Sequence, residues 1–167
     1  MISAMLLEIT NIAENQYSVN KKIISKNFKK LIDQYDQKAF YLAPENYRDN
    51  IVFAAKALNK SNWKKAVQHV FNIKLIQKMP EYKDDSFKTA LIFRFKQTAL
   101  KAFLLRAAKS YQSFSFTSLE QIFEIERHHL FRIVKKMINR NEINAHFDPN
   151  NELLIIDAKN NEINELQ

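Results

Sequence analysis

The first part of the chain repeats its apolar residues at the spacing of three and four that places them on one face of an α-helix. Four such stretches occur before residue 74, and they predict four consecutive helices. Ser18 or Asn20 is a suitable N-cap for the second helix, which is expected to end near residue 37, and Ser61 for the fourth. Pro44 suits the first turn of the third helix, where the missing N–H leaves no hydrogen bond unmade.

The inward-facing positions of these helices follow from the same spacing. They are Met5, Leu6, Ile9, Ile12 and Ala13 in the first, Ile23, Ile24, Phe28, Leu31, Ile32 and Tyr35 in the second, Ile51, Val52, Ala55 and Leu58 in the third, and Trp63, Ala66, Val67, Val70 and Phe71 in the fourth. A short turn joins the third helix to the fourth, so we expect these two to form a helical hairpin.

The helical pattern is interrupted once before residue 111. Residues 74–85 contain Pro80 and mixed charges without a sustained period, which predicts a long loop. From residue 86 to about residue 111 one helical line returns, and Leu100 and Leu104 widen it. Its members are Phe87, Leu91, Phe95, Ala99, Ala102, Phe103 and Arg106. This stretch predicts one long helix.

Shorter elements follow residue 111. Residues 114–116 suit a short strand, and Thr117 with Glu120 matches a capping box that would open a helix through residue 125. Residues 126–140 predict another helix, and residues 143–147 and 153–156 predict a β-hairpin. The inward residues of the second of these helices are Leu130, Phe131, Val134, Met137 and Ile138. Strand, helix, helix and hairpin is the order of a winged helix.

The predicted fold class is therefore mainly α, a helical-repeat bundle followed by a winged helix with a small antiparallel β-sheet. We place the helical part at residues 1–111 and the winged helix at residues 112–157. Residues 158–167 form a polar tail in which Ile163 and Leu166 are the only anchors.

Composition excludes several classes of protein. Hydrophobic residues make up 46% of the 167 residues and 13 are Phe, which indicates a folded chain. Cysteine is absent, so disulfides, thiol catalysis and Cys-ligated zinc are excluded. The apolar runs are much shorter than the roughly 20 residues of a membrane span, and residues 1–5 do not resemble a signal peptide. We expect a cytoplasmic protein with no membrane contact.

Glycine is also absent, and this removes phosphate-binding loops, dinucleotide-binding turns and the nucleophile elbow of hydrolases. Asn is expected at the turns instead, because it tolerates left-handed backbone. The histidines are scattered, and the adjacent His128 and His129 diverge on a helix, so no metal or other cofactor is predicted. The chain is not expected to be an enzyme.

A net charge of +8 and a pI near 9.6 favour an anionic partner. The outward side of the predicted helix 126–140 carries the candidate RNA-binding residues Arg132, Lys135, Lys136 and Arg140, with Asn139 beside them. They suit phosphate contacts, and a solvated basic face is the alternative interpretation. Trp63 would suit base stacking, but its position on an apolar helical face favours the core.

The candidate partner-binding residues are Leu153, Leu154, Ile155 and Ile156. In a strand their side chains alternate between two faces, and only one of these faces can pack against the core of a winged helix. The other face, with an unpaired backbone edge, would be covered by Ile163 and Leu166 of the tail or by a strand from a neighbouring subunit.

The order of elements resembles the PCI domain, and the residues are most similar to the family of the c subunits of eukaryotic translation initiation factor 3. The matching positions span about residues 5 to 148. They are residues 5–9, 24–26 with Phe28, Pro44, Glu45 and Arg48, Lys56 and Ala57, Trp63 and Lys64, and Met137, Ile138, Glu142, Ala145 and Asp148. Ser61 and Asn62 stand where the family usually has Gly-Asp, and residues 74–85 match poorly.

The resemblance implies a C-terminal part of a longer scaffold subunit. Its partners would be other PCI-type subunits of translation initiation factor 3 and the small ribosomal subunit, including its rRNA. In such proteins the sheets of winged helices join side by side between subunits. A winged-helix protein that binds nucleic acid on its own is the alternative hypothesis.

Overall fold

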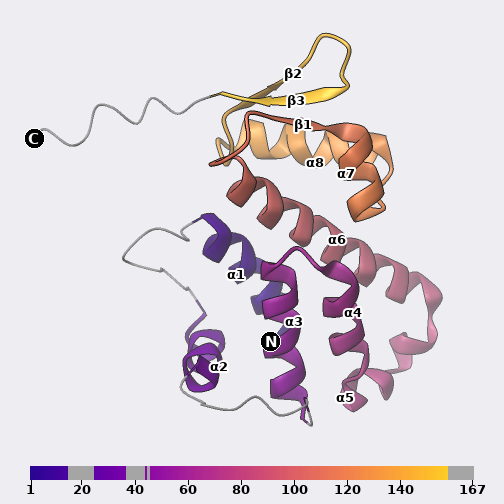
Figure 1. Ribbon diagram of the computed structural model, residues 1–167. Helices are drawn as coiled ribbons and strands as arrows, with labels where there is room; N and C mark the ends of the chain where they lie inside the picture. The colour runs from indigo at the N-terminus through magenta and orange to yellow at the C-terminus, as the bar shows by residue number, and fades with distance from the viewer. Residues whose placement is uncertain (15–24, 37–43, 45, 158–167) are drawn as a thin grey trace, which may run out of the picture. The chain divides into compact units, whose positions relative to one another are not determined.

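The computed structural model describes residues 1–14, 25–36, 44 and 46–157 (Figure 1). The chain divides into two compact units, Met1–Arg106 and Ala107–Gln167. This division lies close to the boundary predicted at residue 111. The predicted caps Ser18 and Asn20, the apolar residues Ile23 and Ile24, and the tail 158–167 with its two anchors lie outside the described residues.

The first unit is helical. Its elements are α1 (Ile2–Glu14), α2 (Lys26–Asp36), α3 (Tyr47–Asn59), α4 (Trp63–Phe71), α5 (Lys74–Gln77), a 3-10 turn η1 (Pro80–Lys83) and α6 (Asp85–Ala107). Helix α3 contacts α1, α2 and α4, and α4 also contacts α5. Helices α3 and α4 form the predicted hairpin (Figure 1).

The predicted apolar stripes of the first unit are largely buried. Those that the structure buries are Met5, Ile9, Ala13, Phe28, Leu31, Tyr35, Ile51, Val52, Ala55, Leu58, Trp63, Ala66, Val67 and Val70 in the first four helices, and Phe95, Ala99, Leu100, Ala102 and Leu104 in α6. Aromatic side chains from three helices also contact one another. The ring centroid of Phe53 in α3 lies 6.3 Å from that of Tyr35 in α2 and 5.5 Å from that of His69 in α4. Burial on one helical face is what the spacing predicted.

A buried carboxylate connects α1 to α2. Glu8 is only 3% exposed, and its Oε1 accepts a 2.7 Å hydrogen bond from the backbone N–H of Ser25, just before α2. The Ser25 hydroxyl in turn accepts from the N–H of Phe28 at 3.4 Å. A negative charge at a helix N-terminus is favourable, so Glu8 and Ser25 together satisfy donors that the helix cannot satisfy itself.

Two of the predicted helix starts in the first unit are wrong. Asn46, two residues after Pro44, caps α3 by accepting from the N–H of Asp49 at 3.0 Å. Asn62 caps α4 by accepting from Lys65 at 3.1 Å, in place of the predicted Ser61. Ser61 instead follows Lys60, the C-cap of α3, and has left-handed backbone with φ of 61°.

The segment predicted as a long loop is mostly short helical turns. It contains α5 and η1, and Pro80 occupies the first position of η1, where a missing N–H is tolerated. Ile76 of α5 is buried, so this one apolar side chain anchors the segment. A turn this short carries too few apolar residues for the helical period to be visible.

The second unit contains β1 (Ser113–Ser115), α7 (Phe116–Phe123), α8 (Arg127–Asn139), β2 (Ala145–Phe147) and β3 (Leu153–Ile156). The three strands form one antiparallel sheet in the order β1-β3-β2 (Figure 1). Phe116, Phe131 and Phe147 join the sheet to the helices, with ring centroids 4.4 to 5.9 Å apart. The described architecture confirms the predicted fold class.

The predicted capping box at Thr117 and Glu120 is wrong, because α7 already begins at Phe116. Ser115 precedes the helix without a side-chain hydrogen bond to it. The first helical N–H, that of Phe116, donates to the backbone oxygen of Glu152 at 3.0 Å. The residue before β3 therefore satisfies the first N–H of the helix.

Candidate functional site

Strand β3, which holds the candidate partner-binding residues, lies in the middle of the sheet. It pairs with β1 through Ser113–Ile155, Phe114–Leu154 and Ser115–Leu153. On its other side it pairs with β2 through Ala145–Ile156, His146–Ile155 and Phe147–Leu154. The expected free backbone edge on Leu153, Leu154, Ile155 and Ile156 is therefore wrong. The outer strands β1 and β2 carry the edges of the described sheet.

The hydrogen-bond pattern shows which backbone groups these edges present. Asp148 N–H donates to Leu153 O at 3.0 Å and Asp157 N–H to Asn144 O at 2.9 Å. Bonded pairs alternate along an antiparallel ladder, so Ala145 and Phe147 direct their N–H and C=O away from β3. The same alternation turns the groups of Ser113 and Ser115 away from β3, because Ile156 N–H donates to Gln112 O at 2.8 Å. Sequence reasoning missed these four residues, since no local pattern reveals strand order.

The two faces of the sheet differ in exposure. Leu154 is fully buried and lies on the inner face with its neighbours Phe114 and Phe147. Leu153 is 39% exposed, and Ile155 is half-buried on the same outer face. His146 shares that face and lies 2.9 Å from Asp157, nitrogen to oxygen. The outer face therefore combines an apolar pair with a polar pair.

Helix α8 carries the candidate RNA-binding residues on its solvent side. Arg132, Lys135, Lys136 and Arg140 are all exposed, as is Asn139. Carboxylates lie close to the basic residues at both ends of the helix, because Arg140 is 3.8 Å from Glu142 and Arg127 is 3.6 Å from Glu120. These exposed pairs reduce the local positive charge, although each contributes little to stability.

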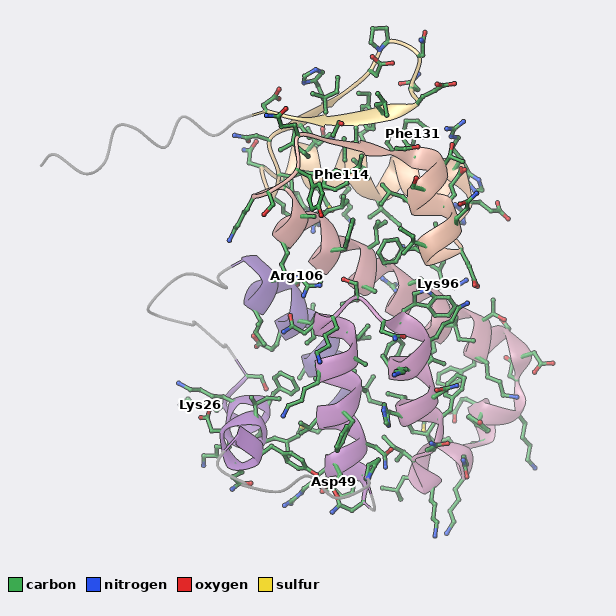
Figure 2. All side chains as sticks on the ribbon, in the orientation of Figure 1. Lys26, Asp49, Lys96, Arg106, Phe114 and Phe131 are labelled. Atoms are coloured by element: carbon green, nitrogen blue, oxygen red, sulfur yellow. The ribbon has the colours of Figure 1, made fainter. Side chains whose placement is uncertain are left out.

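Trp63 belongs to the core of the first unit, with 9% of its surface exposed. The Nζ of Lys96 lies 4.5 Å from the centroid of its ring and the Nζ of Lys64 lies 5.4 Å from it. Both distances suit cation–π contacts. Figure 2 shows Lys96 on α6, which therefore contributes a charge beside the start of α4. Little of the ring is left for a stacked base.

Arg106, further along α6, is tied to the turn between α3 and α4 (Figure 2). Its Nη2 donates to the Ser61 hydroxyl at 2.6 Å and its Nε donates to Ala102 O at 3.2 Å. Burial lowers the pKa of the Arg106 guanidinium below its ordinary value. These hydrogen bonds compensate for part of that burial.

The histidines do not gather around a common point. Among the described residues, no three His, Asp or Glu side chains are placed to hold a metal ion. The Nδ1 of His69 is buried and has no hydrogen-bond partner in this part of the chain. Burial, and secondarily the Lys65 ammonium, lowers the pKa of His69 below its ordinary value. Within the same residues, no helix has the length and apolarity needed to cross a membrane.

Comparison with known proteins identifies relatives. Residues 68–158 match the model of the PCI domain. The C subunit of eukaryotic translation initiation factor 3 from Pyricularia oryzae is 33% identical over 98% of this chain, and its Neurospora crassa counterpart is 32% identical over the same share. The Mycosarcoma maydis counterpart is 33% identical over 89%. The matched regions cover 19%, 19% and 17% of those proteins, so the chain spans about a fifth of their length. The resemblance inferred from the sequence is confirmed.

Proposed function

The chain belongs to the PCI domain family, and on that premise we propose that it is an assembly module of a translation initiation factor 3 complex rather than an enzyme. The named subunits that it resembles support this proposal. In this role the chain would dock other PCI-type subunits through its winged helix and would help the complex associate with the small ribosomal subunit in the cytoplasm.

The observation that carries the docking proposal is the edge of β2. Among the described strands β2 has a neighbour on one side only, and Ala145 and Phe147 direct their backbone groups to the other side. A strand from another subunit would satisfy these groups by β-augmentation. The edge of β1 is less suitable, because Ser115 is followed directly by α7, whose first turn would crowd an added strand.

The side chains next to this edge provide specificity for the added strand. Leu153 and Ile155 lie on the outer face of the sheet, one strand away from the β2 edge. Their exposed apolar surface would be covered by a partner that overlaps the sheet. The candidate partner-binding residues thus remain in the proposal, but they would contact the partner through their side chains, because β3 has no free backbone edge.

A matched pair of proline variants tests the edge. Ala145→Pro removes an outward N–H on β2, and Ser113→Pro removes an outward N–H on β1, while neither removes a bond to β3. We expect Ala145→Pro to abolish capture of the other PCI subunits by the tagged full chain and Ser113→Pro to leave it unchanged. Circular dichroism checks that both variants stay folded.

The opposite pattern, or capture by both folded variants, would contradict docking at β2. A proline at Ile155 is unsuitable for this test, because it would remove a donor from the middle of the sheet. The Leu153→Asp variant tests the outer face of the sheet separately. We expect this variant to stay folded and to capture the other PCI subunits more weakly. A chain that binds RNA tightly but captures no subunit would favour the stand-alone nucleic-acid binder, whose contacts would lie on the exposed α8 residues.

A further inference from the structure

Positive charge is concentrated in the first unit. Residues 1–106 contain 19 Lys and Arg against 9 Asp and Glu, which is a net charge of +10. Residues 107–167 contain 7 Lys and Arg against 9 Asp and Glu, which is a net charge of −2. An anionic partner is therefore attracted to the helical unit more than to the winged helix that contains α8.

Within the first unit three long stretches contain no acidic residue, namely residues 15–32, 50–80 and 86–106. In the second of these, between Asp49 and Glu81, every charged side chain is a lysine, and there are six of them. They are Lys56, Lys60, Lys64, Lys65, Lys74 and Lys78, and all except Lys56 are exposed. The stretch includes most of α3 and all of α4 and α5, so these lysines lie on folded helices and the turns between them.

Four lysines surround the first turn of α4 and are called here the α4 lysine patch. Lys60 ends α3, Lys64 and Lys65 lie in the first turn of α4, and Lys96 reaches this turn from α6. The Trp63 ring holds the ammonium groups of Lys64 and Lys96 within 5.4 and 4.5 Å of its centroid. Side chains held against a ring lose less conformational freedom when they bind a ligand.

We propose that the α4 lysine patch binds the phosphate backbone of RNA, without reading its sequence. Lysine is a point charge that suits single phosphates, whereas base edges are mostly read by Arg, Asn and Gln in bidentate geometry. This proposal rests on the association with the small ribosomal subunit proposed above. It assigns the main RNA contact to the helical unit instead of Arg132, Lys135, Lys136 and Arg140.

An acidic protein surface fits the α4 lysine patch less well. Protein interfaces rely on buried aromatic or aliphatic anchors at their centre. Among the described residues of the first unit, the exposed large hydrophobic ones are Met1, Leu7, Tyr47, Leu75 and Met79, and none lies in the first turn of α4. Trp63, the only large apolar side chain in that turn, is already packed inside the unit. Clustered lysines without an exposed apolar anchor among them favour phosphates.

Two variants with the same change of charge test the proposal. Lys64→Glu with Lys65→Glu reverses two adjacent lysines on α4, and Lys135→Glu with Lys136→Glu reverses two adjacent lysines on α8. Binding of the full chain to a fluorescent single-stranded RNA and to an RNA hairpin is measured by anisotropy at several salt concentrations. We expect the α4 variant to bind at least about 10-fold more weakly at low salt, and its salt slope to fall by about 2.

The α8 variant is expected to keep most of its affinity and its salt slope. An equal or larger loss in the α8 variant would overturn the proposal and return the contact to α8. Unchanged binding by both variants, or no binding by the unaltered chain, would also overturn it. The RNA-binding assay contains no other subunit. A negative result in it would therefore contradict RNA binding by the α4 lysine patch without contradicting subunit docking at β2, so the two failures are distinguishable.

Two further measurements guard against a misfolded variant. Lys60→Glu with Lys65→Glu leaves both cation–π contacts of Trp63 in place, and the same loss of affinity is expected. Trp63 is the only tryptophan, so its emission reports directly on the α4 lysine patch. RNA should change this emission in the unaltered chain and in the α8 variant. Binding without any change in Trp63 emission would place the RNA elsewhere.

Discussion

Replacing Trp63 by alanine should strongly destabilise the first unit. An aromatic side chain buries about 150–250 Å² at about 25 cal/mol per Å², which corresponds to roughly 4–6 kcal/mol of transfer free energy. Trp63 is only 9% exposed, so nearly all of this applies. The alanine retains part of the burial, and an extended reference chain overstates it. We therefore expect Trp63→Ala to lower the free energy of unfolding by about 3–5 kcal/mol.

Urea denaturation followed by far-UV circular dichroism measures this loss. Leu7→Ala is the matched control, because Leu7 is an apolar side chain of the same unit that is 70% exposed. We expect the control to change the free energy of unfolding by less than about 0.5 kcal/mol. A loss below about 1 kcal/mol for Trp63→Ala would refute the core assignment and restore the interpretation of an exposed stacking platform.

Two further predictions concern single residues of the first unit. The lowered pKa of His69 means that the unfolded chain binds a proton more readily than the folded chain, so the free energy of unfolding should fall as the pH decreases below the ordinary value of 6.5 and level off below the folded pKa. Denaturation at several pH values should show a flatter profile for His69→Leu, and parallel profiles would contradict the assignment. For Ser61, the alanine variant loses the hydrogen bond from Arg106 and keeps the left-handed backbone, whereas the glycine variant loses the hydrogen bond and relieves the backbone strain. Thermal denaturation should show the glycine variant to be more stable than the alanine variant by about 1 kcal/mol, and equal stabilities would argue against strain at this turn.

The helices could be predicted from the sequence because burial of one helical face requires apolar residues at a regular spacing within the same short segment. Met5 and Ile9, or Ile51 and Leu58, repeat at helical spacing, and the structure buries all four. Helix starts were less predictable. Asn46 and Asn62 cap helices near Pro44 and Ser61, and several neighbouring residues have suitable side chains. Only the position where the backbone leaves the helical region decides among them.

The candidate site was predictable only in part. The hairpin of β2 and β3 follows from alternation and turn residues, and the structure contains it. The pairing of β1 with β3 joins segments about 40 residues apart, such as Ser113 and Ile155, and depends on how α7 and α8 fold between them. Without that pairing, β3 is assigned a free edge that it lacks. The location of charge likewise needs the division into units, because the total of +8 conceals two parts of opposite sign.

The absence of glycine connects the turns of this chain to its side-chain contacts. Ser61, Glu124, Asn141 and Asn151 all adopt positive φ, so asparagine takes only part of the role expected of it. At the end of α3, Ser61 N–H donates to Leu58 O and Asn62 N–H to Ala57 O, and the same motif recurs at Asn141 after α8. A glycine would adopt this conformation more easily but would offer no side chain. Ser61 has a hydroxyl that accepts a hydrogen bond from Arg106, so a residue that strains the turn also fixes α6 to the hairpin. Lys96, which lies over Trp63, is on the same helix, so α6 contacts both the turn after α3 and the α4 lysine patch.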